Sequence, residues 1–203
     1  MEIVHTPVLL RECLDFLSPV GEPYEKNAFM IDSTLGEGGH TNAFLSKYPE
    51  LKICGVDADS VIQQRAKERL SCFGDRIRFF NGWFNDFYSS YPAEMPKPDL
   101  ILFDLGISVF HYEKSNRGFS FRYDETLDMR LNENGTVSAF DIVNSYSEKD
   151  LADLIFLYGE EKLSRRIASA IVEARSVSEI SSSKSLAEII YNCVPEKYRH
   201  GAI

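Results

Sequence analysis

A glycine-rich turn lies between a stretch with the apolar pattern of a strand and a stretch with that of a helix, and it limits the folds that this chain can adopt. Residues 29–45 read FMIDSTLGEGGHTNAFL, where a short apolar stretch runs through the turn into an amphipathic stretch. This order predicts a β-strand, a tight turn and a helix. Further short apolar stretches at residues 52–57, 76–80 and 99–104 are separated by helical patterns. The alternation predicts a parallel sheet with helical crossovers, which is a doubly wound α/β fold.

Composition and charge narrow the class of protein further. A chain of 203 residues with 44% hydrophobic side chains can bury the core of one domain, or of one domain with an insertion. Its longest apolar runs are too short to span a membrane, so we expect no membrane association and a cytoplasmic location. The net charge of −9 argues against nonspecific binding of nucleic acids, so any RNA contact must be local. The four cysteines lack zinc-type spacing, and we expect reduced thiols and no metal site.

The N-terminal residues carry a helix signal of their own. Thr6 followed by Pro7 is a favoured start of a helix, because threonine caps free N–H groups and proline suits the first helical position. The stretch PVLLRECLDFL then has an apolar stripe, which stops at Ser18 and Pro19. We therefore expect a short amphipathic helix at the beginning of the chain.

The second half of the chain has a different pattern from the first. Residues 111–135 show no periodicity, which is typical of a functional loop. Beyond this loop the patterns are helical, with a strong amphipathic stretch at 160–176 and a serine-rich hinge at 181–185. Ser147 and Asp150 resemble a capping box at the start of a helix. We expect an incomplete Rossmann-like domain at residues 1–108 and a connecting loop with a helical domain at 109–203.

The residues of the turn discriminate between nucleotide ligands. Gly36 and Gly38 allow the backbone to approach a ligand closely, but Thr41 replaces the third glycine of a dinucleotide fingerprint. Glu37 lies where a pyrophosphate would bind and would repel it, and no P-loop lysine follows. Asp57 closes the next strand, 19 residues after Gly38, which suits a carboxylate that accepts both ribose hydroxyls. These features favour S-adenosylmethionine; the alternative is a turn that holds no ligand.

Longer motifs along the chain resemble those of a known family. HTPVLL, DSTLGEGGH, GVDAD, DLGIS, RGFSF, LDMR and YGEEKLSRRIASAIVEAR closely resemble the bacterial methyltransferases that modify a cytosine of small-subunit ribosomal RNA at N4, the MraW or RsmH family. The resemblance implies a class I Rossmann-like methyltransferase sheet with strands one to four present and an all-helical substrate-recognition domain inserted after strand four. It also implies S-adenosyl-L-methionine as cofactor and a cytosine in the decoding region of 16S ribosomal RNA, within the small ribosomal subunit, as substrate.

The resemblance assigns cofactor contacts to the positions that match the family motifs. Physical arguments agree, because glycines let the backbone approach the methionine part, a carboxylate accepts the ribose and an aromatic ring faces the adenine. His40 has an alternative role as a solvated side chain at the start of a helix. His111 stands where the family normally has glutamine, and Val109 stands where it has a second serine. The implied cofactor contacts are Gly38, Gly39, His40, Asp57, Phe84, Asp104 and His111.

Asp104 is the candidate for the reaction centre. The lone pair of a cytosine amino group is delocalised into the ring, so methyl transfer requires the methyl donor and the amine to be held in line. Asp104 follows the fourth strand, where a doubly wound sheet binds its ligands, and can accept a hydrogen bond from the amine or from the cofactor. The next residues are LGIS in place of the proline-aromatic motif of other N4-methylating enzymes. The sequence therefore identifies no group that holds the base.

The loop at residues 111–135 combines arginines with aromatic residues. Arginines suit phosphates and aromatic rings suit unstacked bases, so this composition is typical of a contact with single-stranded RNA. In the alternative interpretation the aromatic rings are buried, and the arginines pair with Asp124 and Asp128. The candidates for RNA contact are Arg117, Arg122 and Arg130, which are interleaved with Phe119, Phe121 and Tyr123.

Family sequences continue beyond the residues that match HGAI at positions 200–203, with strands that complete the sheet. We therefore expect a C-terminally truncated member of the family, in which strand four is an exposed apolar edge if the sheet order is 3-2-1-4. Such an edge favours self-association, and we expect little methyl transfer from this chain alone. The alternative to an active methyltransferase is a catalytically inactive fragment, or a module that binds the cofactor or RNA.

Overall fold

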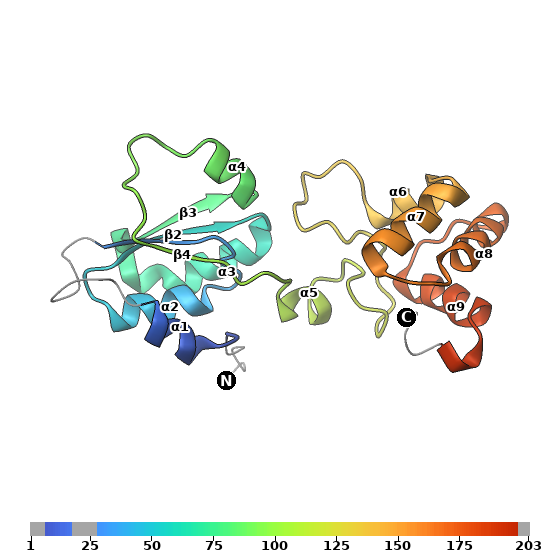
Figure 1. Cartoon of the computed structure of the whole chain (residues 1–203), viewed down its shortest axis with the longest axis horizontal. Coiled ribbons are helices and arrows are strands. Elements are labelled where there is room, and N and C mark those ends of the chain that lie inside the picture. The colour runs from blue at the N-terminus through green and yellow to red at the C-terminus, as the bar shows by residue number, and fades with distance from the viewer. Residues whose placement is uncertain (1–6, 18–27, 199–203) are drawn as a thin grey trace. The chain divides into compact units, whose positions relative to one another are not determined.

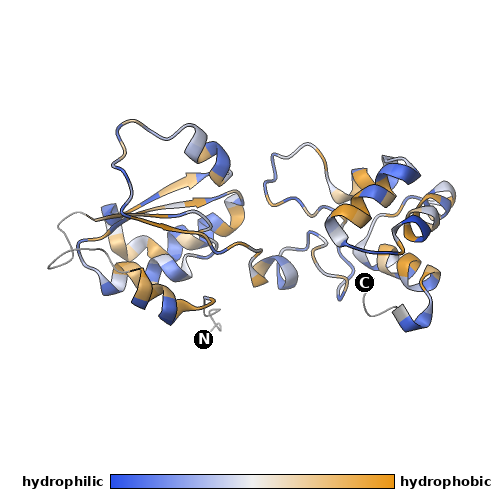
Figure 2. Cartoon of the chain, in the orientation of Figure 1, coloured by the Kyte–Doolittle hydropathy of each residue, from blue (hydrophilic) through white to orange (hydrophobic). Residues whose placement is uncertain are grey.

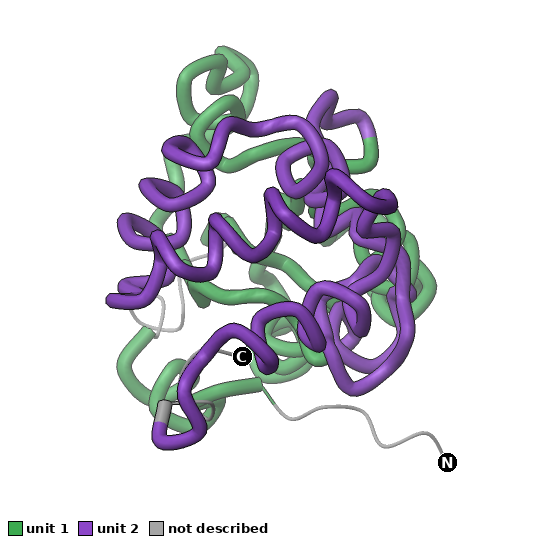
Figure 3. The backbone as a smooth tube through the Cα atoms, turned by 90° about the vertical axis from the view of Figure 1, so that its right-hand side faces the viewer, with its two compact units in different colours: residues 1–109, 131–133 green, residues 110–130, 134–203 purple. Residues whose placement is uncertain are grey.

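The computed structural model describes residues 7–17 and 28–198, which belong to two compact units. The sheet unit comprises Met1–Val109 and Leu131–Glu133, and the helical unit comprises Phe110–Arg130 and Asn134–Ile203 (Figure 3). Each unit contains its own cluster of buried hydrophobic side chains. The two units are therefore described separately.

The sheet unit is built on a four-stranded parallel sheet with the order β3-β2-β1-β4 (Figure 1). Its strands are predominantly hydrophobic (Figure 2) and lie within one or two residues of the stretches expected from the sequence. This order confirms the predicted α/β fold, and it puts the carboxyl ends of all four strands at the same edge. The strands are β1 (Phe29–Asp32), β2 (Lys52–Asp57), β3 (Ile77–Asn81) and β4 (Leu100–Leu102).

Helices cover both faces of this sheet. Successive side chains of a strand point to opposite faces, so Met30 packs with residues of α2 and α3 whereas Ile31 packs with residues of α4. Both side chains are fully buried, and burying a residue of this size contributes roughly 1.5 to 3 kcal/mol. Figure 1 shows α2 and α3 on one side of the sheet and α4 on the other. The helices are α1 (Leu10–Phe16), α2 (Gly39–Lys47), α3 (Ser60–Leu70) and α4 (Phe84–Ser89), with a 3-10 turn at Ser71–Arg76.

The start of the described chain differs from the sequence expectation. Helix α1 begins at Leu10, so Pro7 lies outside the helix that it was expected to open. Pro7 packs instead on Gly39, where an added Cβ would lie 2.4 Å from Pro7 Cγ. Thr6, the expected cap, lies outside the described residues. The tertiary contact at Gly39 therefore overrides the local preference of proline for a first helical turn.

The helical unit is formed by amphipathic helices around one apolar cluster. Leu151 of α7 and Ile167, Ala168 and Ile171 of α8 are at the centre of this cluster, each at most 3% exposed. None of the helices in the described residues is both long and apolar enough to cross a membrane. The helices of this half are α5 (Val109–Glu113), α6 (Ala139–Ser145), α7 (Glu148–Gly159), α8 (Ser164–Val177) and α9 (Ser183–Cys193), with a 3-10 turn at Glu196–Tyr198.

Serine side chains begin three of these helices. Ser147 Oγ accepts a hydrogen bond from the Asp150 N–H at 3.1 Å, as its spacing predicts. Ser182 forms a capping box with Ser185 at the start of α9. The expected serine-rich hinge at 181–185 is therefore wrong, because these hydroxyls satisfy the free N–H groups of a helix. Ser138 caps the short helix α6 in the same way, which the sequence analysis did not anticipate.

The segment between α5 and α6 lacks helices but is fixed by hydrogen bonds. Gly118 adopts φ +82°, and an added Cβ there would lie 2.3 Å from the carbonyl oxygen of Thr126. Its N–H donates to the buried Glu125 carboxylate at 2.9 Å. The Glu125 carbonyl in turn accepts the Ser183 N–H at 2.9 Å, and one antiparallel bridge joins Thr126 to Ser182. The glycine of RGFSF thus allows this loop to fold onto the start of α9.

Candidate cofactor and reaction site

The glycine turn connects the carboxyl end of β1 to the first residue of α2. Gly36 and Gly38 have φ values of +53° and +74°, which residues with a side chain rarely adopt. A Cβ on Gly38 would also lie 2.8 Å from Leu70 Cδ1 of α3. Glycine is therefore needed at position 38 both for the backbone conformation and for the close approach of α3. The turn leaves backbone N–H groups at the start of α2, at the edge where parallel sheets bind ligands.

Asp57 holds the turn from the end of the neighbouring strand β2. Its Oδ2 accepts the Gly36 N–H at 2.7 Å, and its Oδ1 accepts the Asp59 N–H at 2.9 Å. A carboxylate oxygen can accept two hydrogen bonds, so these two contacts are compatible with the expected ribose contact of Asp57. Asp57 therefore has a structural role that its position in the sequence did not indicate.

A second carboxylate explains why the dinucleotide fingerprint is broken. Asp32, at the end of β1, is 1% exposed, and its Oδ2 accepts the Thr41 hydroxyl at 2.7 Å. Burial raises the pKa of Asp32, and the hydrogen bond from Thr41 opposes this shift. Thr41 occupies the position of the third glycine because its hydroxyl fixes the first turn of α2 to β1. The threonine at the position of the third glycine thus has a structural role, because it links α2 to β1.

Glu37, which was expected to repel a pyrophosphate, is paired with an arginine. Its Oε1 accepts a hydrogen bond from Arg65 Nη1 of α3 at 2.9 Å, in a partly exposed ion pair. Its carbonyl oxygen accepts a weak hydrogen bond from Arg69 at 3.4 Å. A paired carboxylate repels a pyrophosphate much less than an isolated one. Glu37 therefore argues against an anionic ligand less strongly than its position in the sequence suggests.

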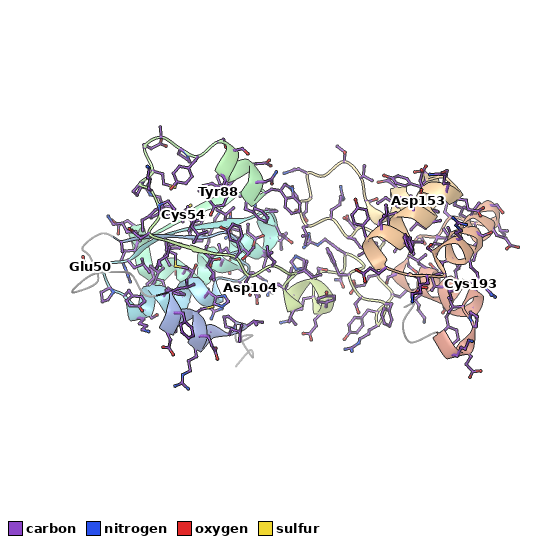
Figure 4. All side chains as sticks on the ribbon, in the orientation of Figure 1. Glu50, Cys54, Tyr88, Asp104, Asp153 and Cys193 are labelled. Carbon is purple, nitrogen blue, oxygen red and sulfur yellow. The ribbon has the colours of Figure 1, made fainter. Side chains whose placement is uncertain are left out.

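His40 and Asp104 face each other beside the turn. The His40 ring is buried, with its Nδ1 4.0 Å from Asp104 Oδ2 and its Nε2 3.0 Å from the carbonyl oxygen of Val8. The alternative role of His40 as a solvated cap is therefore wrong. The Asp104 side chain is 44% exposed, and its own N–H donates to Thr34 Oγ1 at 2.7 Å. Figure 4 shows Asp104 just beyond β4, with Glu50 at the opposite end of the sheet.

Aromatic rings lie next to Asp104 on the α4 face of the sheet. Phe84 meets Phe103 edge to face, with ring centroids 5.3 Å apart. Tyr88 lies 6.0 Å from Phe103 and forms a hydrogen bond of 2.8 Å with the Ser33 hydroxyl. Burial raises the pKa of the Tyr88 phenol. Phe103 is 45% exposed and was missed from the sequence, although its position directly before Asp104 at a strand end was a usable signal.

His111 belongs to the helical unit, unlike the other expected cofactor contacts. Its ring is 4% exposed and packs edge to face with Phe119 and Phe110, at centroid distances of 5.1 and 5.8 Å. The His111 carbonyl accepts the Ser115 hydroxyl at 2.6 Å. Its side chain therefore has a packing role within the segment that follows β4.

The structure divides the arginine-aromatic loop into an inner and an outer group. Arg117 is 9% exposed and donates to the Arg130 carbonyl at 2.9 Å. Arg130 pairs with both carboxylate oxygens of Asp128, at 2.8 and 2.7 Å. The pair of Arg130 with Asp128 matches the packing alternative, and Arg117 is buried with a backbone carbonyl as acceptor. The outer group, here the loop tip, consists of Phe121, Arg122 and Tyr123, which are all exposed.

Within residues 7–17 and 28–198, no three His, Cys, Asp or Glu side chains are grouped so that they could hold a metal ion. At the carboxyl edge of its sheet, the sheet unit presents carboxylates, the His40 imidazole, aromatic rings and backbone N–H groups. This donor set fits a ligand with hydroxyl groups, an aromatic base and an amino group.

Comparisons with known proteins agree with the motifs. The pattern of the MraW methylase family matches residues 2–203. Ribosomal RNA small subunit methyltransferase H of Treponema denticola is 61% identical over 203 residues, which are 100% of this chain and 63% of that protein. The proteins of the same name from Borrelia hermsii and Borreliella burgdorferi are 47% and 45% identical over 95% and 94% of this chain, and over 64% of each protein. The chain thus spans less than two thirds of the length of these relatives. Since the family pattern covers nearly all its residues, this chain belongs to the MraW methylase family.

Proposed function

We propose that this chain carries the cofactor site and helical unit of a ribosomal RNA methyltransferase. The methyl donor is S-adenosyl-L-methionine, and the acceptor is N4 of a cytosine in the decoding region of 16S ribosomal RNA within the small subunit in the cytoplasm. The observation that carries this proposal is the convergence of the glycine turn, Asp57 and Asp104 at one edge of the sheet. The names of the relatives supply the class of substrate.

The residues at this edge fit each part of the proposed cofactor. Asp57 would accept hydrogen bonds from the ribose hydroxyls, and Phe84 with Phe103 would supply ring faces and edges for the adenine. The turn at Gly38 and Gly39 would let the backbone approach the methionine part. The ligand carries a sulfonium cation and no phosphate, which suits an edge that bears carboxylates.

Asp104 and His40 would orient an amine for the reaction. The cofactor supplies an electrophilic methyl group when bound. Asp104 would accept a hydrogen bond from one N–H of the cytosine amine, and this bond would direct the lone pair of the amine nitrogen toward the methyl carbon. The same carboxylate would then lie near the proton that the methylated amine must lose. His40 Nδ1 is 4.0 Å from the Asp104 oxygen, which suits a second acceptor for the same amine. Asp104 is therefore the proposed catalytic residue.

The loop tip is the proposed RNA contact of the helical unit. Phe121, Arg122 and Tyr123 expose two aromatic rings and one guanidinium on consecutive residues. An aromatic ring stacks on an unpaired base, and arginine binds the phosphate beside it. Arg117 and Arg130 would act indirectly, by fixing the loop from which these residues project.

Binding measurements and a methyl-transfer assay test this proposal. Titration calorimetry of the full chain should show binding of S-adenosylmethionine and S-adenosylhomocysteine, with NAD as the negative control. Any transfer of radiolabelled methyl groups from the full chain to undermethylated small ribosomal subunits should be lost in Asp104→Ala. Binding of NAD alone would reject the cofactor assignment. Cofactor binding without transfer would favour the second candidate, a binding module, because the chain covers 63% of its Treponema denticola relative.

A further inference from the structure

Residues Pro7–Leu9 form a strap across the glycine turn and the start of α2. Pro7 Cγ occupies the space that a side chain on Gly39 would need, since a Cβ there would be 2.4 Å away. The Val8 carbonyl lies 3.0 Å from His40 Nε2. The strap therefore contacts the first two residues of α2: Pro7 packs on Gly39, and Val8 is hydrogen-bonded to His40.

The strap is anchored by the helix that follows it. The carbonyl of Leu14 in α1 accepts hydrogen bonds from Lys47 Nζ at 2.8 Å and from the Tyr48 hydroxyl at 3.3 Å. Leu9, the last residue of the strap, adopts φ +50°, a left-handed conformation that is unfavourable for leucine. The Leu9 side chain is 65% exposed, so its own burial does not explain this conformation. This conformation directly follows the contacts of Pro7 and Val8, which hold the strap against the start of α2.

The hydrogen bond to Val8 determines where the proton of the His40 ring lies. A backbone carbonyl can only accept, so His40 Nε2 must be the donor. When the ring is neutral, Nδ1 then has no hydrogen and is an acceptor, and this atom is the one that faces Asp104 at 4.0 Å. We propose that the strap is a positioning element of the site, which fixes the His40 ring so that Nδ1 and Asp104 Oδ2 form a pair of acceptors for one amino group.

This arrangement depends on the strap because the ring has another option. Without the Val8 carbonyl, the ring could carry its hydrogen on Nδ1 and donate it to Asp104, which would turn Nδ1 into a donor and occupy one acceptor site of the carboxylate. With the strap in place, two acceptors 4.0 Å apart suit a single group that carries two hydrogens. The inference rests on the proposed function, which supplies two such groups: the amino group of the cofactor and the amino group of the cytosine.

NMR of the full chain tests the effect of the strap on His40. The chain has four histidines, so long-range ¹H–¹⁵N spectra at alkaline pH are simple, and His40→Gln identifies the His40 signal. We expect a proton on Nε2 in the native chain. Leu9→Pro forbids the left-handed conformation and should give a mixture of tautomers, as should Leu9→Val if the proline variant does not fold. Leu9→Asn tolerates that conformation and should restore the native signal. Phe16→Ala, on the exposed surface of α1, is the matched control.

Ligand titrations of the same variants identify the amino group. If it belongs to the cofactor, Leu9→Pro should weaken S-adenosylhomocysteine roughly three- to tenfold and leave 5′-methylthioadenosine, which lacks the amino acid part, unchanged. If the amino group belongs to the base, Leu9→Pro should lower the affinity for an RNA fragment that contains the cytosine. Its affinity for the same fragment with uridine at that position should be unchanged.

Two results would overturn the proposal. One is a native His40 proton on Nδ1, or an Nε2 proton that Leu9→Pro does not disturb. The other is a disturbed tautomer with all affinities unchanged, which would make the strap a packing contact only. Failure of the native chain to bind S-adenosylhomocysteine would instead reject the proposed function, and the tautomer measurement does not depend on that binding.

Discussion

Asp57 has a structural role beside the ribose contact proposed for it. Because its carboxylate accepts the N–H groups of Gly36 and Asp59, Asp57→Ala should release the glycine turn as well as the ribose position. We expect the free energy of unfolding to fall by about 2 kcal/mol, since hydrogen bonds to charged groups contribute about 1.5 to 3 kcal/mol each and this site is partly exposed. Affinity for S-adenosylhomocysteine should fall at least about tenfold. Urea unfolding followed by the fluorescence of Trp83, the single tryptophan, and calorimetry measure the two effects.

Glu50→Ala is the matched control for Asp57→Ala. Glu50 is an exposed carboxylate at the opposite end of the sheet (Figure 4), so its loss should change neither quantity. Unaltered stability in Asp57→Ala would contradict the tether, and unaltered affinity would contradict the ribose contact. The two readouts therefore separate the structural role of this residue from its proposed functional one.

Asp128 makes the stability of the helical unit depend on pH. The hydrogen bond from the Arg130 side chain lowers the pKa of Asp128 below its ordinary value. A carboxyl with a lowered pKa stabilises the fold above its ordinary value of about 3.9, and this stabilisation is lost as the pH falls through the lowered value. Asp128→Asn should therefore reduce unfolding free energy by about 1 to 3 kcal/mol at pH 7 and by much less near pH 2. Thermal unfolding followed by circular dichroism measures this, and an equal difference at both pH values would contradict the ion pair.

At the scale of elements, long and strongly patterned segments could be predicted from the sequence. The strands of the sheet and the helix after the glycine turn follow from apolar runs and turn residues, because backbone alternation and the positive φ of Gly38 are local properties. Helices α4 and α6 were missed since they have only six and seven residues, too few for an apolar period to show. The serine stretch at 181–185 was mistaken for a hinge. Serine is common both in flexible segments and at helix starts, and here Ser182 caps a helix that begins at Ser183.

The candidate site was only partly predictable for the same reason. Asp57 ends an apolar strand and Asp104 comes two residues after another, so their place at the carboxyl edge could be inferred. The contacts of His40 and Pro7 join residues 32 positions apart in sequence, which no local pattern records. Likewise, the sequence places Arg117 and Arg122 in one loop but does not show that the first is buried and the second exposed.

Gly118 tests whether the RGFSF loop is a fixed element of the helical unit. In Gly118→Ala, an alanine would have to adopt a positive φ, and its Cβ would lie 2.3 Å from a backbone oxygen. We therefore expect the free energy of unfolding to fall by more than about 2 kcal/mol. Gly159→Ala, at the end of α7, is the control, because its added Cβ would meet nothing within 4 Å. Circular dichroism should show a lowered transition for Gly118→Ala, while Trp83 fluorescence, which reports on the sheet unit, should keep its transition. Equal stability of the two variants would contradict the tight loop.

The loop tip should bind RNA without serving the cofactor. Arg122→Ala with Tyr123→Ala removes an exposed guanidinium and an exposed ring, and should weaken binding of a decoding-region RNA fragment by roughly 10- to 100-fold. The salt dependence of that binding should also become shallower, because a phosphate contact is lost. Fluorescence anisotropy at several salt concentrations measures both effects, and calorimetry with S-adenosylhomocysteine should show no change. Lys184→Ala, an exposed cation on α9, is the control. A loss of thermal stability with unchanged RNA affinity would contradict the contact.

At the scale of the whole molecule, charge and architecture favour local recognition. A net charge of −9 opposes approach to RNA, so the proposed RNA binding would have to come from few, well-placed contacts such as the loop tip. The division into a sheet unit and a helical unit assigns the proposed cofactor chemistry to one unit and the proposed RNA contact to the other. Mutations that separate the two functions are therefore expected to fall in different units, as Asp57 and Arg122 do.

The last prediction concerns the edge strand β4, which pairs with β1 on one side in the described sheet. Ile101 and Phe103 are 42% and 45% exposed on the α4 face, and Leu105 beyond them is 74% exposed. An apolar strand with unpaired N–H and C=O groups offers a template for a second chain, so we expect this chain to self-associate with increasing concentration. Size-exclusion chromatography with light scattering measures the molar mass. Ile101→Lys should shift the protein toward the monomer by putting a charge on the edge, whereas Tyr158→Lys, 85% exposed on α7, should not. A monomer at every concentration, or association that responds to Tyr158→Lys alone, would show that β4 is not the contact.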